Sequence, residues 1–302
     1  MVTEPMKDKI ADFVSGFSIE TTPLGAKKTH DFREHLDKGT WVYVTSLPGS
    51  DFIDTVDACK KLSNEGMVPV PHFTARSIAN RKTFEENLSM VVGEAGVERV
   101  LAIAGADRNP AGDYKDTMTL LETGLFDKFG IRSIGLAGHP EGSPDITSDQ
   151  LKEHGLHKSR YSQTTAANLY LVTQFVFEAK PVIDWVEKIN GYGNEMPVVV
   201  GLPGLATTKS LIKHAYNCGI GPSMGILKKQ PKNITKLLTL QEPDKLVFDL
   251  TKYIYNKPDS RIDGVHVFPF GGLSSSAAWS NAVANSEIEC HSTGFKVNAK
   301  RS

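Results

Sequence analysis

Three side chains that could exchange protons stand where short apolar runs of this chain end. Glu20 lies in FSIET (17–21), His72 lies in MVPVPHFT (67–74), and Asp107 follows RVLAIAG (99–105). A carboxyl group in a water-poor pocket has a raised pKa and can act as a general acid. A solvated rim charge fits the position of Glu20 equally well. Taken singly, Asp107 fits a turn cap, and His72 fits a hydrogen-bonded structural histidine.

A fourth polar side chain interrupts an apolar run. Gln174 stands in LVTQFVF, and an amide is costly to bury without hydrogen-bond partners. We therefore expect Gln174 to face a ligand. The stretch FGGLSSSAAW (270–279) is typical of a glycine turn that opens a helix, where free N–H groups can bind a phosphate. An ordinary serine-capped helix fits that stretch as well.

Short apolar runs rich in β-forming residues recur along the whole chain. They are FSIET (17–21), WVYVTSL (41–47), MVPVPHFT (67–74), RVLAIAG (99–105), IRSIGLAG (131–138), NLYLVTQFVF (168–177), PVVVGLPG (197–204) and GVHVFPFGG (264–272). Most are one βαβ step apart, and several are apolar throughout, as in parallel strands covered on both faces. Eight strands alternating with helices predict a single (β/α)₈ barrel over residues 1–302. A doubly wound sheet is the alternative, but residues 20–26 lack a G-x-G-x-x-G turn.

Helices are predicted between these runs. Residues 51–63 place five apolar side chains on one helical face: Phe52, Ile53, Val56, Cys59 and Leu62. Further helices are predicted over 83–95, 115–127, 178–190 and 207–217, the last with Thr207 as N-cap. An extra helix over 243–256 is predicted between the seventh and eighth strands. In such a barrel the active site lies at the C-terminal ends of the strands.

The composition argues against several classes of function. Lys and Arg number 34 against 35 Asp and Glu, without the basic stripe of a nucleic-acid binder. No apolar run approaches the ~20 residues of a membrane-spanning helix. Cys59, Cys218 and Cys290 are too scattered for a disulfide framework, and the absence of an H-E-x-x-H set predicts no metal. The first residues lack the apolar core of a signal peptide, so we expect a cytoplasmic protein that binds small polar metabolites.

An ordered series of motifs resembles one enzyme family. It consists of Glu20-x-x-Pro23, the V-T at Thr45, PHFTAR (71–76), AIAGAD (102–107), GHPEGSP (138–144) and TQFVF (173–177). This order, from about Ser18 to about Phe270, resembles the methylenetetrahydrofolate reductase family of flavin enzymes. The resemblance implies a (β/α)₈ barrel that binds FAD at the strand C-termini. It also implies interconversion of 5,10-methylene- and 5-methyltetrahydrofolate.

The resemblance implies a role for each matched residue. Glu20 would protonate N10 of the folate, so that its five-membered ring opens to an iminium cation at N5. Asp107 would stabilise that cation, Gln174 would hydrogen-bond the pterin, and Phe177 would be a further substrate contact. The implied contacts to FAD are Thr45, His72, Ala104, Gly105, Asp107, His139, Glu141 and Ser143.

The chain departs from the family pattern at three places. The family's Y-P-x-x-H-P reads His139-Pro-Glu-Gly-Ser143-Pro, so both cofactor-contacting side chains differ. Gln163 falls near the position of a family lysine, which predicts rearranged phosphate contacts to FAD. Thr208 stands where an aromatic residue can stack on nicotinamide, which predicts poor use of NADH and NADPH.

Other functions stay open on the sequence alone. A folate enzyme that does not use NAD(P)H could run in the oxidative direction. A non-enzymatic folate- or flavin-binding protein could keep the acid by descent, and a phosphate-substrate lyase could use FGGLSSS. A homo-oligomer is also left open.

Overall fold

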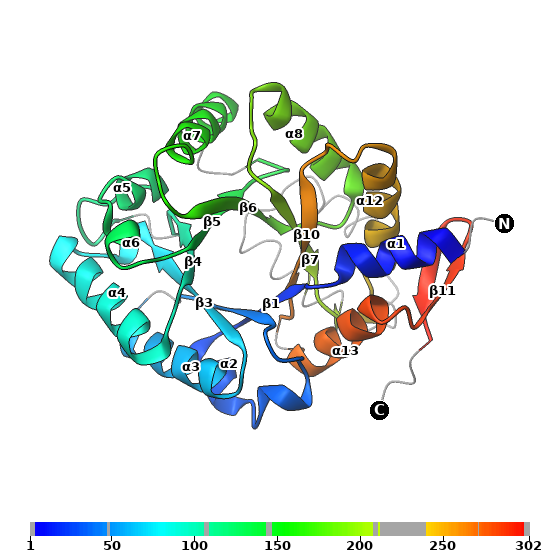
Figure 1. Cartoon of the computed structure of the whole chain (residues 1–302), viewed down its shortest axis with the longest axis horizontal. Coiled ribbons are helices and arrows are strands. Elements are labelled where there is room, and N and C mark those ends of the chain that lie inside the picture. Colours follow the sequence, from blue (N-terminus) through cyan, green and yellow to red (C-terminus); the bar gives the residue numbers. More distant parts are fainter. Residues whose placement is uncertain are drawn as a thin grey trace. The chain divides into compact units, whose positions relative to one another are not determined.

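Eight parallel strands close into a barrel, as the sequence predicts (Figure 1). The computed structural model describes residues 4–46, 49–105, 109–142, 147–207, 211, 240–270 and 272–298. Around the barrel the strands follow the order β1-β10-β7-β6-β5-β4-β3-β2. They are β1 (Ser18–Thr21), β2 (Trp41–Val44), β3 (Val68–Thr74), β4 (Arg99–Ile103), β5 (Ser133–Gly138), β6 (Asn168–Phe175), β7 (Val198–Pro203) and β10 (Ile262–Phe268).

The chain divides into two compact units. One comprises Ser18–Ala137 and His157–Val172 and is called the β1–β5 unit. The other comprises Met1–Phe17, Gly138–Leu156 and Thr173–Ser302 and is called the β7–β10 unit. Each is described by itself below.

Helices of the β1–β5 unit begin and end at residues that the sequence provides for this purpose. They are α2 (Pro23–Lys28), α3 (Phe52–Asn64), α4 (Arg81–Ala95), α5 (Thr117–Leu121), α6 (Leu125–Lys128) and the last part of α7 (Ser148–Tyr161). The Asp51 side chain accepts a hydrogen bond from the Ile53 N–H at the start of α3, and Asn80 caps α4 in the same way through Thr83. Between strands and helices Phe73, Phe84 and Phe126 pack with ring centroids 5.2–5.8 Å apart.

Two details of the helix predictions are wrong in this unit. Val56, Cys59 and Leu62 are buried on α3 as predicted, but Ile53 is 42% exposed, and Thr55 and Ala58 are buried as well. The single helix predicted over 115–127 is two short helices, α5 and α6, separated by a turn that ends at Gly124. Helices α2 and α7 were not predicted as elements.

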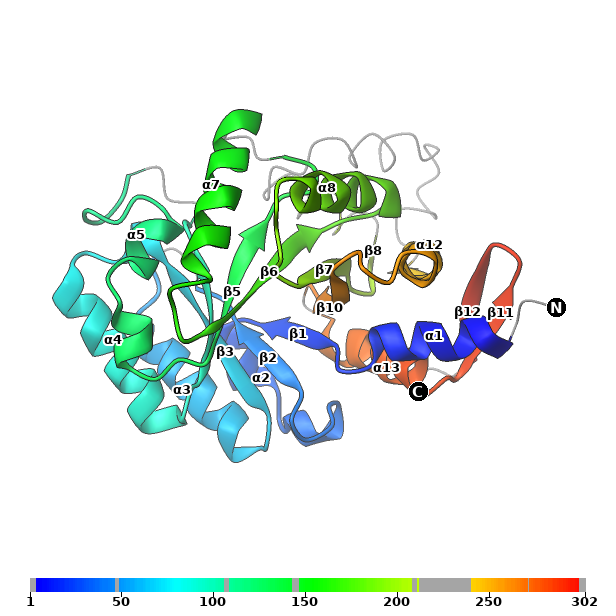
Figure 2. The ribbon, with the colours of Figure 1, turned by 45° about the horizontal axis from the view of Figure 1, so that its top comes forward.

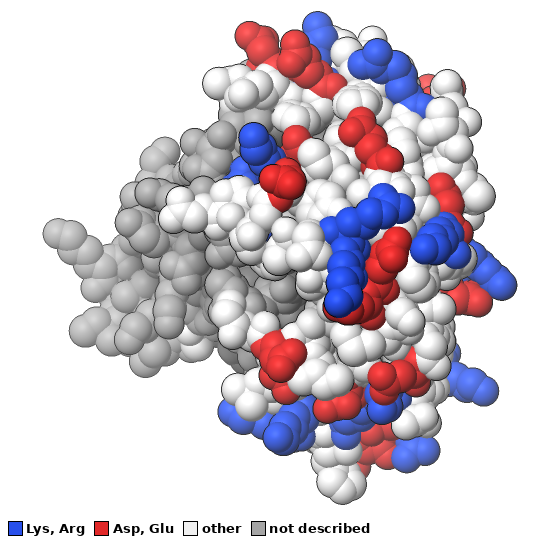
Figure 3. Space-filling view, turned by 90° about the vertical axis from the view of Figure 1, so that its left-hand side faces the viewer, with Lys and Arg blue, Asp and Glu red and all other residues white. Residues whose placement is uncertain are grey.

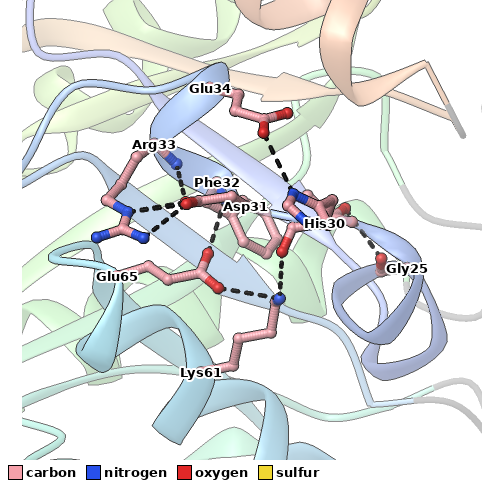
Figure 4. Close-up of polar contacts among 9 residues, drawn as sticks. Gly25, His30, Asp31, Phe32, Arg33, Glu34, Lys61 and Glu65 are labelled. Carbon is pink, nitrogen blue, oxygen red and sulfur yellow. Dashed lines mark hydrogen bonds and ion pairs between the residues drawn. The ribbon is translucent and has the colours of Figure 1, made fainter.

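A polar network fixes the connection between β1 and β2 to helix α3 (Figure 4). The Lys61 ammonium donates to the His30 carbonyl at 3.0 Å and pairs with Glu65 at 2.9 Å. Glu65 in turn accepts the N–H of the fully buried Phe32 at 2.7 Å. The side chains of Lys61 and Glu65 thereby pair backbone groups just before and at the start of the 3₁₀ helix Phe32–Glu34, as buried backbone groups require.

The helices of the β7–β10 unit include the first and the last described helix of the chain. They are α1 (Glu4–Val14), α8 (Ala179–Gly191), α12 (Asp244–Asn256) and α13 (Leu273–Ala284). Helix α1 packs against α12, α13 and the hairpin of β11 (Ile288–His291) and β12 (Gly294–Val297) (Figures 1 and 2). Trp279 of α13 donates its indole N–H to Asp244 at the start of α12, 2.8 Å away. Neither α1 nor the hairpin was predicted.

The connection between β7 and β10 contains the predicted helix over 243–256, which is α12. Thr207 is the last residue of the short strand β8 (Ala206–Thr207), and its predicted role as an N-cap stays a prediction because residues 208–210 lie outside the described residues. This strand pairs antiparallel with β9 (Leu240–Gln241). The rest of the helix predicted over 207–217 lies outside the described residues, apart from Leu211.

Opposite charges are interspersed on the helices. Lys60 of α3 pairs with Glu94 of α4 at 2.9 Å, and Lys128 of α6 pairs with Glu85 of α4 at 3.3 Å. Figure 3 shows the two signs side by side on the described surface that it presents. Within the described part of the chain, every helix is too short or too polar to cross a lipid bilayer.

Candidate active site

Glu20 is an acidic side chain near the C-terminal end of β1 in the β1–β5 unit. It lies one residue before the end of β1, and its carboxyl oxygen Oε2 is 3.7 Å from Nε2 of His72 on β3. Because β2 lies between β1 and β3 in the barrel, this approach places both side chains inside it. Only 20% of the Glu20 side chain is exposed, and burial raises the pKa of its carboxyl to about 8. Glu20 is therefore protonated at neutral pH, as a general acid must be.

His72 is a buried neutral imidazole. Its side chain is 8% exposed, and desolvation lowers its pKa to about 3. Its Nε2 atom has no hydrogen-bond partner among the described residues. The edge of its ring meets Tyr43 with centroids 6.0 Å apart and planes at 82°. A buried polar atom without a partner is rare in a folded protein, so Nε2 of His72 is a candidate contact for a ligand.

Thr45 supplies a second buried polar atom without a partner. It follows β2 directly, and its N–H donates to the Thr21 carbonyl at 3.0 Å, which continues the strand pairing. Its hydroxyl Oγ1 is buried and finds no partner among the described residues. Beside it, the hydroxyls of Ser46 and Thr74 are 3.4 Å apart. The ends of β2 and β3 thus present polar atoms that the described part of the protein does not satisfy.

Ala104 and Gly105 form a close backbone approach after β4. The Arg76 N–H donates to the Ala104 carbonyl at 2.9 Å, and the Arg76 guanidinium donates to the Gly105 carbonyl at 3.4 Å. Gly105 has φ +90°, and a Cβ atom there would lie 3.2 Å from Cβ of Thr74. Only glycine adopts this backbone without strain. Glycine is thus needed for the chain after β4 to pass close to Thr74 at the end of β3.

A layer of paired polar side chains lies inside the barrel in the same unit. The hydroxyls of Tyr43 on β2 and Tyr170 on β6 are 2.7 Å apart, and burial raises the pKa of Tyr170 to about 12. The Arg99 guanidinium lies 4.3 Å from the ring centre of Trp41 and donates to the Ser133 hydroxyl at 2.7 Å. These polar atoms have protein partners, in contrast to those of Thr45 and His72.

Lys158 on α7 is a candidate that the sequence did not reveal. Burial lowers the pKa of its ammonium to about 8, and Nζ donates to the Ala137 carbonyl in β5 at 3.2 Å. Gln163, which falls near the family lysine in sequence, is exposed in the turn after α7. An ammonium has three donors, and this half-buried one has a single acceptor, the Ala137 carbonyl, among the described residues, so it is suited to an anion. A buried lysine at this strand end has no sequence signal beyond its helical spacing.

The β7–β10 unit contains an aromatic cluster. Phe175 is 2% exposed and packs against three phenylalanines: Phe177 (5.8 Å between centroids), Phe268 (5.6 Å) and Phe270 (4.8 Å). Gln174 precedes Phe175 and is half-buried. A Cβ atom at Gly201 would lie 2.6 Å from the Gln174 carbonyl oxygen and 2.7 Å from the Phe268 ring, so this glycine is needed for the packing.

The remaining candidates divide between described and undescribed residues. His139 and Glu141 lie in the turn after β5, closed by the hydrogen bond from the Gly142 N–H to the His139 carbonyl at 3.1 Å. Asp107, Ser143 and Thr208 lie outside the described residues. Ser276 of FGGLSSS is fully buried and accepts the Leu205 N–H at 3.2 Å, so its hydroxyl serves the fold.

The structure thus brings Glu20, Thr45, His72 and Gly105 together at the strand ends of one unit. The fold and these residues define a (β/α)₈ barrel with a protonated carboxyl at its mouth. Residues 17–252 match the profile of the family described as methylenetetrahydrofolate reductase, and the chain belongs to that family.

Curated relatives match part of the chain. Over 166 residues the chain is 20% identical to methylenetetrahydrofolate reductase 2 of Saccharomyces cerevisiae, covering 52% of this chain and 26% of the relative. Over 140 residues it is 27% identical to methylenetetrahydrofolate reductase 1 of Schizosaccharomyces pombe, covering 42% and 21%. The matches span about a quarter of each relative's length.

A solved structure shares the fold. It is an uncharacterized protein from Clostridium thermocellum that binds two copies of 5-methyl-5,6,7,8-tetrahydrofolic acid. Its TM-score is 0.55 at 13% identity, and the match covers 91% of this chain and 99% of that one.

Proposed function

We propose that this chain is a flavin-dependent enzyme that interconverts 5,10-methylenetetrahydrofolate and 5-methyltetrahydrofolate. The observation that carries the proposal is a carboxyl, Glu20, whose pKa is raised to about 8 beside the unpartnered Nε2 of His72. Ring opening of a methylenefolate needs an acid that still holds its proton at neutral pH. Family membership and the folate bound by the Clostridium thermocellum protein support a folate as substrate.

The residues at the ends of β2, β3 and β4 fit a flavin. Thr45 offers a buried hydroxyl without a partner among the described residues, and Gly105, with φ +90°, lets the backbone after β4 pass close to Thr74. Thr45, His72, Ala104 and Gly105 would therefore hold the cofactor, with His139, Glu141 and Ser143 as further contacts implied by the motifs. A bound flavin exchanges a hydride with the one-carbon unit of the folate.

Residues of the chain would transfer the proton to the folate and stabilise the positive charge that forms on it. In the reductive direction Glu20 gives its proton to N10, the C–N10 bond breaks, and an iminium cation remains at N5. A carboxylate at Asp107 would stabilise this cation, which exists only along the reaction path. The Gln174 amide would hydrogen-bond the pterin, and Phe177 would contact it. Hydride addition to the methylene carbon then gives the 5-methyl product.

Lys158 is proposed as a phosphate contact of the cofactor. Its buried ammonium has one described hydrogen-bond acceptor, the Ala137 carbonyl. A phosphate oxygen would satisfy the remaining donors and restore the charge that burial disfavours. We assign this contact to Lys158 because Gln163, which falls near the family lysine in sequence, is exposed in the turn after α7.

For the electron partner we propose a compound other than NADH or NADPH, with oxidation of 5-methyltetrahydrofolate as the favoured direction. Thr208, on which this rests, is too small to stack on nicotinamide. Phe268 and Phe270 stack on each other at 6.3 Å and 18°, so they already pack within their own cluster.

The test begins with the absorption spectrum of the purified protein, which should show a flavin. Anaerobic stopped-flow mixing with 5-methyltetrahydrofolate should bleach it, and NADH at the same concentration should bleach it at least ~10²-fold more slowly. Absence of flavin, or no bleaching by the folate, contradicts the proposed function. Fast bleaching by NADH contradicts only the proposed electron partner.

A further inference from the structure

The side chains of Glu20 and His72 face each other inside the β1–β5 unit. The carboxyl Oε2 and imidazole Nε2 are 3.7 Å apart, and Nε2 is buried with no hydrogen-bond partner among the described residues. This separation is slightly longer than a hydrogen bond, as is common before a substrate closes an active site.

We propose that His72 is the positioning residue of the acid: its unprotonated Nε2 accepts a hydrogen bond from the protonated Glu20 carboxyl. The pair then holds a single proton, which resides on the carboxyl until a folate nitrogen takes it. This inference rests on the proposed function and adds a role to the cofactor contact that the motifs imply for His72.

The surroundings of the pair favour the neutral arrangement over an ion pair. Burial disfavours both the carboxylate and the imidazolium, raising the pKa of Glu20 and lowering that of His72. An imidazolium partner would instead lower the pKa of Glu20. A neutral acceptor binds the protonated carboxyl and leaves the proton available for transfer.

Among the described residues, the neighbouring elements contact the imidazole without supplying a counter-charge. From β2, Tyr43 presents its ring to His72, while its hydroxyl is bound to Tyr170 of β6. The cation of β4 facing this interior is Arg99, which is bound to Trp41 and Ser133. From the end of β3, Thr74 contributes an uncharged hydroxyl that lies near Ser46.

The first experiment measures the pair directly and needs no turnover. ¹⁵N NMR of the histidine-labelled full chain is recorded from pH 5 to 9, and the His72 signal is assigned by its loss in His72→Gln. We expect a neutral ring with the proton on Nδ1 and with Nε2 unprotonated at pH values below about 8, where Glu20 still holds its proton. An imidazolium near pH 7, or a proton on Nε2 in that range, would overturn the proposal. The exposed His30 serves as the reference signal of a histidine outside the barrel.

The second experiment separates positioning from structure. His72→Gln keeps an acceptor oxygen and should retain kcat within about threefold. His72→Phe removes the acceptor and should lower kcat for methylene reduction ~10-fold, with a shifted basic limb of the pH profile and little change in folate KM. His30→Gln is the control for a histidine outside the barrel.

The outcomes distinguish this proposal from the proposed function. If His72→Phe binds flavin normally and keeps the wild-type kcat and pH profile, the positioning role is wrong. If His72→Phe does not fold, the NMR measurement on the wild-type protein still decides. If the wild-type protein turns over no folate, the proposed function fails, and the protonation state of His72 stands as measured.

Discussion

The barrel interior differs in kind between the two compact units. In the β1–β5 unit, polar side chains enter the barrel, and Thr45 and His72 keep buried atoms without described partners. In the β7–β10 unit the corresponding strand ends, β6 and β10, carry phenylalanines that pack on one another around Phe175. The strand ends of the first unit keep unpartnered polar atoms, whereas those of the second pack on one another. The other unpartnered buried atom among the described residues, Asn194 Oδ1, lies between α8 and β7 and not at such a strand end.

The difference separates strand ends that could take part in catalysis from strand ends whose packing stabilises the fold. Unsatisfied buried polar groups lower stability and persist where a ligand uses them. A well-packed aromatic cluster contributes stability and a rigid wall. Substitutions at the strand ends of the first unit should therefore change catalysis or binding, whereas substitutions that disturb the packing around Phe175 should mainly change stability.

The substitution Glu20→Gln is expected to have the largest effect, which is a loss of catalytic rate. The amide preserves shape and removes the transferable proton, so methylene reduction should fall ~10²–10⁴-fold while flavin and folate binding persist. Single-turnover reduction of 5,10-methylenetetrahydrofolate measures this. Glu34→Gln, at an exposed carboxyl, is the control. A Glu20→Gln rate within a few fold of wild type would remove Glu20 from the acid role.

Gly201→Ala should mainly affect stability. The new Cβ would lie 2.6 Å from the Gln174 carbonyl oxygen, and overpacking of this kind costs about 3 kcal/mol. Urea unfolding measures the loss. Gly191→Ala, in α8 of the same unit with open space at its Cβ position, should change stability by less than about 1 kcal/mol. Equal effects of the two changes would contradict the packing described for the aromatic cluster.

The pH dependence of stability should reveal the Glu20 proton. The pKa of Glu20 is about 8 in the folded chain against an ordinary 4.5, so the unfolded chain loses this proton first as pH rises. The contribution of the neutral carboxyl is complete below about 4.5 and is lost as pH rises through about 8. Glu20→Gln should therefore be more stable than wild type by about 1–3 kcal/mol at pH 8 and equal at pH 4. A difference that does not vary with pH would show that Glu20 is ionised when folded.

The smallest expected effect is on cofactor affinity through Lys158→Met. Loss of one charged contact to a phosphate should weaken flavin binding ~10-fold. The flavin-free protein should become slightly more stable near pH 7, because a buried ammonium is removed. Flavin titration and thermal unfolding measure the two effects, and Lys152→Met on the exposed surface of α7 is the control. Unchanged flavin affinity in Lys158→Met would place the phosphate elsewhere.

Part of the fold and of the candidate site could be predicted from the sequence. The eight strands follow from apolar runs at βαβ spacing, and Glu20, Thr45 and His72 follow from their places at strand ends. The break at Gly124 and the strand at Thr207 could not be found, because a turn and a two-residue pairing leave little local pattern. The exposure of Ile53 depends on which way α3 packs, and helical spacing alone does not set that.

The sequence by itself determined the strand count, the family and the types of residue at the strand ends, because these depend on local pattern and motif order. The tertiary structure decided which polar atoms stay unsatisfied. It brought Glu20 to His72 across β2 and buried Lys158 against the Ala137 carbonyl. Both effects arise because a closed barrel puts residues far apart in the chain within hydrogen-bonding reach and removes water from them, and the resulting pKa shifts depend on that burial.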